Sequence, residues 1–121
     1  MICCYLTSSF QKSLKKINSI TESDLISLFK KYPNSRQIIE LDRLNDSKIL
    51  KCYLLSKKVR CLVLFQYVKN IFIPVSIVKK ESKFGKNISK KNYENLFSHD
   101  IEKAINDVQS HNYKTININE I

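Results

Sequence analysis

The fold is decided by the stretch KILKCYLLSKKVRCLVLFQYVKNIFIPVSIVK, residues 48–79. Its β-branched and aromatic residues fall into three runs, at residues 48–55, 59–67 and 71–78, and such runs favour strands. The three residues 56–58 between the first two runs are short enough for a hairpin turn. The stretch therefore predicts an antiparallel meander of three strands.

The alternation of residues in the second run predicts how the meander is covered. Val59 and Cys61 lie on one face of this strand, and Arg60 and Leu62 lie on the other. Because both faces are apolar in the middle of the meander, helices are expected to cover at least one of them. Pro74 has no N–H for the ladder, so the third strand is expected either at a sheet edge or bulged at that point.

Further elements are predicted on both sides of the meander. Residues 2–6 form a short apolar strand that stops at a Thr-Ser-Ser cap. Apolar residues recur with helical spacing over residues 10–17 and 21–32, which predicts two consecutive helices in a hairpin. Ser98 is expected to cap a last helix over residues 98–111, and residues 113–121 alternate as a terminal strand does.

The composition favours one domain over residues 1–121. A length of 121 residues is usual for a domain, and a single glycine with two prolines leaves little material for linkers. Residues 42–46 and the polar stretch 79–91 are expected to be loops. The predicted fold class is α+β, with a small, mostly antiparallel sheet packed against an N-terminal helical hairpin and with a C-terminal helix.

Positive charge is concentrated in the middle of the chain. Residues 48–91 contain twelve lysines and arginines and one acid, Glu81, so this window carries +11, whereas the whole chain carries +10. The residues outside the window therefore sum to −1. Clustered like charges add their fields and attract a polyanion, so this distribution favours nucleic acid as a partner.

The four cysteines, Cys3, Cys4, Cys52 and Cys61, lack the spacing of a metal site. No CxxC pair is present and neither histidine lies at ligand spacing, so neither a metal nor a cofactor is expected. Reduced thiols are typical of a cytoplasmic protein. The N-terminal sequence has no charged segment and only a short apolar run, so neither a signal peptide nor a membrane span is expected.

Two segments of the meander carry a more specific pattern. They are Lys-Cys-Tyr-Leu-Leu-Ser-Lys-Lys-Val-Arg-Cys-Leu-Val-Leu (Lys51–Leu64) and Ile-Phe-Ile-Pro-Val-Ser-Ile-Val-Lys-Lys (Ile71–Lys80). A strand that bears a lysine leads through a turn to a strand that opens with an aliphatic residue and an arginine, and a third apolar strand ends in two lysines. This pattern, with the order strand, two helices, three strands, basic loop and helix, resembles the RelE/ParE superfamily of bacterial toxins.

The resemblance implies the toxin of a toxin–antitoxin pair, a metal-independent mRNA endoribonuclease of RelE/HigB type that inhibits translation. Lys51 takes the place of a strand lysine that acts in proton transfer, and Arg60 that of an arginine that stabilises the scissile phosphate. Lys79 and Lys80 match a basic pair that aids transition-state charge. The implied partners are a cognate antitoxin, mRNA and, where cleavage depends on it, the ribosome.

The composition is consistent with this chemistry. Cleavage of RNA without a metal requires that the 2′-hydroxyl lose a proton, that the phosphorane be neutralised and that the leaving oxygen be compensated. Both histidines, His99 and His111, lie outside the basic window, so lysine and arginine are the groups available within it. A catalytic tyrosine or histidine of several family members has no clear counterpart, and Tyr53 and Tyr93 are the candidates.

Other residues of the window are predicted to bind the RNA backbone or its bases. Lysines that neutralise phosphates would control affinity and its dependence on salt, and tyrosines among them suit stacking on single-stranded RNA. The predicted RNA-binding residues are Lys48, Lys57, Lys58, Lys83, Lys86, Lys90, Lys91, Tyr53 and Tyr93.

Each of these residues also has a structural explanation. Arg60 can pack its stem at the rim of the core with its head in solvent, and Lys51 can protect a strand edge. The basic stretch 79–91 can be a solvated loop. Two other functions also stay open: a ParE-like toxin that binds and inhibits DNA gyrase without hydrolysis, and a basic nucleic-acid-binding domain with no toxicity.

Overall fold

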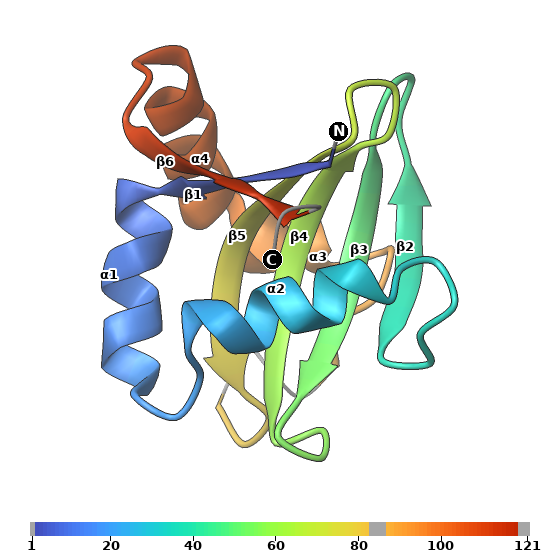
Figure 1. The fold of residues 1–121 in the computed structure, drawn as a ribbon. Coiled ribbons are helices and arrows are strands. Elements are labelled where there is room, and N and C mark those ends of the chain that lie inside the picture. The colour runs from blue at the N-terminus through green and yellow to red at the C-terminus, as the bar shows by residue number, and fades with distance from the viewer. Residues whose placement is uncertain (1, 83–86, 119–121) are drawn as a thin grey trace.

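The computed structural model describes residues 2–82 and 87–118 (Figure 1). Within them, six strands form one sheet, flanked by four helices. The strands are β1 (Cys3–Thr7), β2 (Ile38–Arg43), β3 (Lys48–Leu54), β4 (Val59–Gln66), β5 (Ile71–Lys79) and β6 (Tyr113–Asn117). The helices are α1 (Ser8–Ile17), α2 (Glu22–Lys30), α3 (Tyr93–Leu96) and α4 (Ser98–Gln109). The predicted α+β class is confirmed.

The strands follow the order β2-β3-β4-β5-β1-β6. β1 runs parallel to β5, with Cys3 opposite Ile71 and Cys4 opposite Phe72, and the other neighbouring pairs are antiparallel. The predicted meander is present as β3, β4 and β5. β1 and β6, from opposite ends of the chain, lie side by side and extend this meander beyond β5 (Figure 1).

β2 is a strand that the sequence did not reveal. A loop was predicted to begin at Asp42, whereas β2 continues through Arg43 and pairs with β3. The register of this pairing shifts between Glu40 and Asp42, which interrupts the alternation that identifies a strand. β2 lies at the edge of the sheet, where charged side chains are tolerated because they reach solvent.

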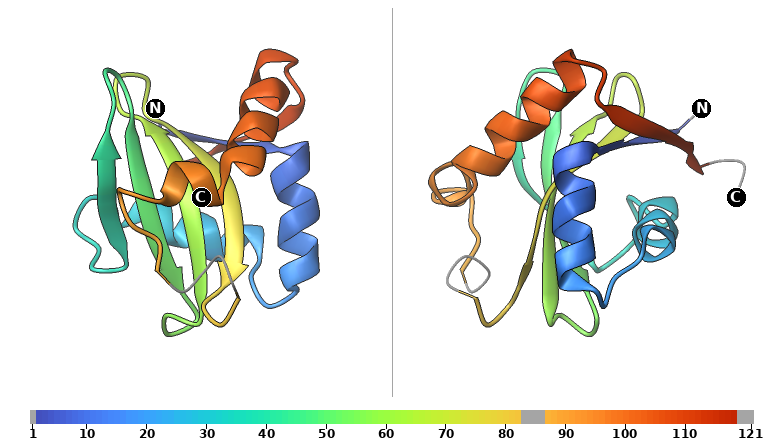
Figure 2. Two further views of the ribbon diagram at one scale, coloured as in Figure 1. Left: turned by 180° about the vertical axis from the view of Figure 1, so that it is seen from behind. Right: turned by 90° about the vertical axis from the view of Figure 1, so that its left-hand side faces the viewer.

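Helices cover both faces of the sheet (Figure 2). α1 and α2 lie on one face, over a core that includes Cys61 and Phe72, and we call this the α1/α2 face. α3 and α4 lie on the opposite face, over a smaller core that includes Leu62, and we call this the α4 face. α1 and α2 run in different directions, and α1 packs against β5 and α4 (Figure 1). The predicted hairpin is therefore replaced by two helices that each pack on the sheet.

The first two helices begin where the sequence predicts them. The Thr7 hydroxyl accepts a hydrogen bond from the Phe10 N–H at 3.2 Å, which caps α1. Thr21 and Asp24 form a capping box at the start of α2, with each side chain accepting from the other residue's N–H. Ser98 is the first residue of α4 and Phe97 is its N-cap, so the predicted cap lies one position too late.

Pro74 lies at a bulge and not at an edge. β5 is enclosed between β4 and β1, so the expectation of an edge strand is wrong. Leu62 of β4 pairs with Ser76, while the next residue, Val63, pairs with Pro74. Val75 is thus the extra residue of a bulge, and the other predicted alternative is confirmed.

Candidate nucleic-acid interface

Lys51, Tyr53 and Arg60 form a compact group on the α4 face. Tyr53 of β3 lies directly opposite Arg60 of β4, and Lys51 shares the face of Tyr53 because the two residues are two positions apart in the strand. The Lys51 Nζ and the Arg60 Cζ each lie 5.1 Å from the centre of the Tyr53 ring. Each cation is therefore in range of the ring's negative face, which is worth about 0.5–2 kcal/mol per contact.

Both cations of this group are mostly buried. The exposed fraction is 8% for Lys51 and 8% for Arg60. The Lys51 ammonium donates a hydrogen bond to the backbone carbonyl of Ile88 at 3.1 Å. A charge removed from water is costly unless it is hydrogen-bonded or paired, and this hydrogen bond offsets part of that cost for Lys51.

Residues 87–93 contact this group at Lys51, and we call them the covering segment. Ile88 is buried in the core of the α4 face, and the Asn92 side chain accepts a hydrogen bond from the Ser89 N–H at 2.8 Å. At the end of the segment the Tyr93 hydroxyl donates to the Asp42 carboxylate at 2.8 Å. The covering segment is thereby tied to β2, and Lys51 lies beneath it.

Tyr93 serves as the anchor of the covering segment. Its exposed fraction is 2%, so its ring has no open face on which a base could stack, contrary to the expectation from sequence. Burial and the hydrogen bond to Asp42 raise the pKa of Tyr93 well above its usual value. The same bond, the Arg43 N–H and the nearby Lys90 lower the pKa of Asp42.

Ser76 and Asp100 are polar residues of the α4 face that the sequence analysis missed. Ser76 lies opposite Leu62 on β5, and its hydroxyl donates to the Asp100 carboxylate at 2.6 Å. This bond ties the first turn of α4 to the sheet. The available signal was a lone serine within the apolar run of β5, because a buried polar side chain needs a partner.

Lys79 does not share the sheet face of Lys51 and Arg60. Val78 pairs with Arg60, whereas Lys79 pairs with Val59, so the Lys79 side chain belongs to the α1/α2 face. Lys80 follows the end of β5, and its N–H donates to the Lys58 carbonyl at 2.8 Å. The four residues that the resemblance assigns to catalysis are therefore divided between two places in the structure.

The predicted RNA-binding lysines are also distributed over several surfaces. Lys48 lies on the α1/α2 face, where its Nζ is 3.4 Å from a Glu40 carboxylate oxygen and donates to the Tyr32 hydroxyl. Lys90 forms an ion pair with Asp42 at 3.7 Å. The exposed lysines are Lys57, Lys58 and Lys91, in addition to Lys90. Lys83 and Lys86 lie outside the described residues.

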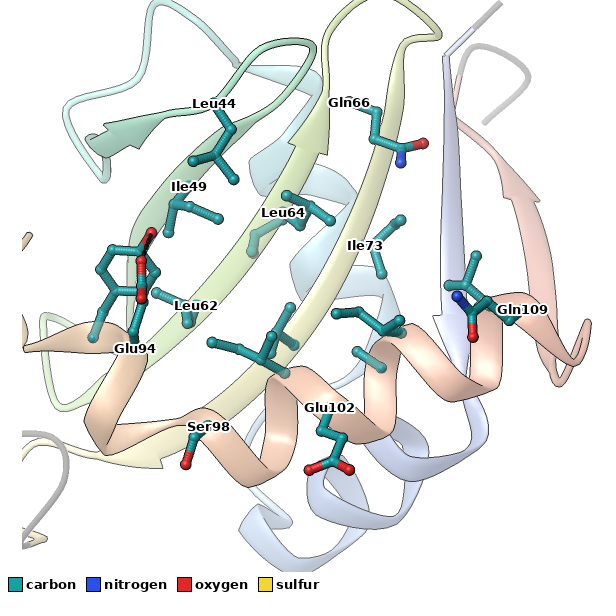
Figure 3. A pocket seen from close by; sticks show the side chains of 17 residues that line it. Leu44, Ile49, Leu62, Leu64, Gln66, Ile73, Glu94, Ser98, Glu102 and Gln109 are labelled. Carbon is teal, nitrogen blue, oxygen red and sulfur yellow. Dashed lines mark hydrogen bonds between the residues drawn. The ribbon is translucent and has the colours of Figure 1, made fainter.

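An apolar groove of about 630 Å³ runs between α4 and the sheet (Figure 3). Its floor includes Ile49, Leu64 and Ile73, and Glu94 lies at one end of it, whereas the Glu102 carboxylate points away from the sheet. An apolar floor offers no donor to a phosphate, and the Glu94 carboxylate repels one. The groove is therefore distinct in chemistry from the cationic group that lies beside it on the same face.

Two features are absent from residues 2–82 and 87–118. No three His, Cys, Asp or Glu side chains of this part lie close enough together to hold a metal ion. No helix of it has both the length and the apolar character needed to cross a membrane.

Comparison of the chain with protein-family models, with curated proteins and with solved structures found no match.

Proposed function

We propose that this protein is the toxin of a toxin–antitoxin pair and acts as a metal-independent mRNA endoribonuclease in the cytoplasm. The observation that carries the proposal is the placement of Lys51 and Arg60 around Tyr53. These are the residues that the resemblance to RelE-like toxins assigns to proton transfer and to the scissile phosphate. Their mutual approach to one ring supports a shared site.

The proposed roles follow from the chemistry of each side chain. The Arg60 guanidinium can hold two oxygens of the scissile phosphate at once, and it remains charged throughout the reaction. The Lys51 ammonium can give a proton to the leaving 5′-oxygen as its bond to phosphorus breaks, while the 2′-oxygen forms the new bond to phosphorus and loses its proton to water. Tyr53 fixes the direction of both cations through its ring, which is pre-organisation of charge for the transition state.

The covering segment must move before RNA reaches this site. In the structure the Ile88 carbonyl accepts a hydrogen bond from one of the three N–H donors of Lys51, in a position that a phosphate oxygen could take. A phosphate can replace that carbonyl as acceptor, and it adds a full negative charge between two cations. We therefore propose that RNA displaces the covering segment from Lys51 as it binds.

The order of elements supports a RelE-like arrangement in part. The first strand, two helices and antiparallel meander follow the expected order. The edge strands β2 and β6 and the short helix α3 depart from that pattern. The proposed partner is an antitoxin with an acidic or amphipathic segment, because such a segment complements the basic surface and adds apolar contacts.

Expression in bacteria tests the proposal. Wild-type protein is expected to arrest growth and to create new RNA 5′ ends, detected by primer extension on a reporter mRNA. Arg60→Ala is expected to lower the cleavage rate about 100- to 1000-fold, by analogy with the loss of an oxyanion donor. Arg36→Ala is the matched control, because Arg36 is exposed in a turn and carries the same charge.

A second variant guards against misfolding, since Arg60 is buried. Arg60→Lys keeps the charge but loses the two-point grip, so it is expected to fold and still cleave slowly. Circular dichroism reports whether each variant is folded. The nuclease proposal fails if folded wild-type protein yields no new RNA ends.

The burial of Lys51 and Arg60 favours a second candidate, a ParE-like toxin that binds and inhibits DNA gyrase without hydrolysis. Such a protein needs no access to buried cations. A supercoiling assay with purified gyrase separates the two functions. Inhibition of supercoiling while RNA stays intact would select this candidate, whereas RNA cleavage without inhibition would exclude it.

A further inference from the structure

A small pocket of about 240 Å³ lies where β4 begins and β5 ends, and we call it the sheet-end pocket. Its lining residues are Ser19, Leu55, Lys58, Val59, Lys79, Lys80 and Glu81. We propose that the sheet-end pocket holds a backbone phosphate of the bound RNA strand, one that is not cleaved. The inference rests on the proposed function, and it assigns Lys79 and Lys80 to RNA binding and not to the reaction.

Three separate segments build this pocket. The turn between β3 and β4 supplies Lys58, the end of β5 supplies Lys79 and Lys80, and the connection between α1 and α2 supplies Ser19. The hydrogen bond from the Lys80 N–H to the Lys58 carbonyl joins the first two segments. Lys58 is therefore brought next to Lys79 and Lys80 by the pairing of the strands, because these residues are far apart in the sequence.

The lining of the pocket carries more positive than negative charge. Lys48, Lys90 and Lys114 each lie within 4 Å of an acid, at 3.4, 3.7 and 2.7 Å. Within residues 2–82 and 87–118, none of the three pocket lysines forms an ion pair. The lining contains one acid, Glu81, and three lysines, so the pocket has a net positive charge and favours an anion.

The chemistry of the pocket matches a phosphate that is held for position. Lysine is a compact point charge that neutralises a phosphate without the two-point geometry of arginine. The Ser19 hydroxyl is able to donate to a phosphate oxygen. Contacts of this kind fix the register of a nucleic acid and do not read its bases.

The pocket also lies within reach of a strand bound at Arg60. Lys58 and Arg60 are two residues apart on one chain, which is about 7 Å in a strand. Because Lys79 is on the α1/α2 face, an RNA strand that occupies both places passes around the end of the sheet. A single strand is flexible enough to follow such a basic track.

Binding of uncleavable RNA as a function of salt tests this inference. The probe is a short, fluorescent, single-stranded oligoribonucleotide with methylated 2′-hydroxyls, and its anisotropy gives Kd at several salt concentrations. The slope of log Kd against log salt is expected to fall by about 0.7 in Lys79→Gln/Lys80→Gln, since that is the contribution of one phosphate in a single strand.

The matched control is Lys69→Gln/Lys103→Gln, which removes the same charge. Lys69 lies in the turn at the opposite end of the sheet and Lys103 lies on the exposed side of α4. The control is expected to keep the wild-type slope. If both double variants have the same slope, the inference about the pocket is overturned. That result would not bear on RNA cleavage by the wild type, which is measured separately.

Two further measurements separate the alternatives. With cleavable RNA, Lys79→Gln/Lys80→Gln is expected to raise KM and to keep kcat, and a loss of kcat at unchanged KM would instead place these lysines in the reaction. Inorganic phosphate alone is expected to compete weakly with RNA. Competition by phosphate as strong as that by the oligonucleotide would identify the pocket as a small-anion site. If the wild-type protein binds RNA but does not cleave it, the proposed nuclease function is refuted, whereas the proposed phosphate site in the sheet-end pocket is not.

Discussion

Replacing Asp107 with alanine tests the packing of α4 against α1. Near the end of α4, the Asp107 carboxylate accepts hydrogen bonds from the Ser9 N–H at 3.0 Å and from the Ser9 hydroxyl at 2.6 Å. It therefore caps the first turn of α1 with a negative charge, which the helix dipole favours. These two bonds join segments that are 98 residues apart in the chain.

The expected effect follows from the number and exposure of these bonds. A hydrogen bond to a charged group contributes about 1.5–3 kcal/mol, and partial exposure of Asp107 reduces each to about 1 kcal/mol. The loss of both lowers the free energy of unfolding by about 2 kcal/mol at pH 7. With an unfolding entropy of roughly 0.25 kcal/mol/K for a chain of this length, Tm falls by about 8 °C.

The effect of Asp107→Ala depends on pH in a defined direction. Burial raises the pKa of Asp107, but the Ser9 hydrogen bonds, Asn112 and the charge of Lys12 outweigh it, so the pKa lies below its usual value. A carboxyl with a lowered pKa stabilises the folded state fully above the unfolded pKa, near pH 4, and loses this contribution as the pH falls through the folded pKa. The difference from wild type is therefore expected to shrink at pH 3.

Thermal unfolding followed by circular dichroism at pH 7 and pH 3 is the assay. Glu102→Ala is the matched control, because it removes a carboxylate from the exposed side of the same helix. The control is expected to shift Tm by no more than about 2 °C, as surface substitutions usually do. The reasoning is refuted if Asp107→Ala behaves like the control at pH 7, or if its effect is the same at both pH values.

Three further predictions concern the thiols, one turn and the covering segment. Ellman's reagent is expected to modify Cys3 rapidly in native protein and the other three thiols only on unfolding, since burial raises their pKa; rapid release from two thiols would contradict this. Lys57→Gly is expected to raise the urea midpoint, because Lys57 has φ 73° and left-handed backbone costs roughly 1 kcal/mol; a lower midpoint would count against it. Tyr93→Phe removes the bond to Asp42, so amide exchange in residues 87–93 and RNA cleavage should both become faster, and unchanged exchange would disprove the anchor.

Much of the fold was predictable because it depends on local patterns. Alternation in β4 correctly separated Arg60 and Leu62 from Val59 and Cys61, since successive side chains of any strand point to opposite faces. The capping box at Thr21 was predictable because it needs only residues three positions apart. β2 was missed because its pairing with β3, and not its own sequence pattern, makes it a strand.

The candidate site shows the same division. Its composition, with Lys51, Arg60 and Tyr53, was determined by the sequence alone, because these residues share a hairpin whose turn sets their register. The separation of Lys79 from Arg60 was decided by the register between β4 and β5, which includes the bulge at Val75. A shift of one residue would move Lys79 to the other face, and alternation within one strand carries no information about its neighbour.

The covering of the site was likewise decided by tertiary structure. The sequence alone shows that residues 48–91 are basic. One interpretation of this charge was that it lies in a solvent-exposed loop. Only the folded chain brings the Ile88 carbonyl to Lys51 and Tyr93 to Asp42, across 37 and 51 residues. These contacts between residues far apart in sequence form only when α3 and α4 pack against the sheet. No local sequence pattern specifies which distant groups then meet.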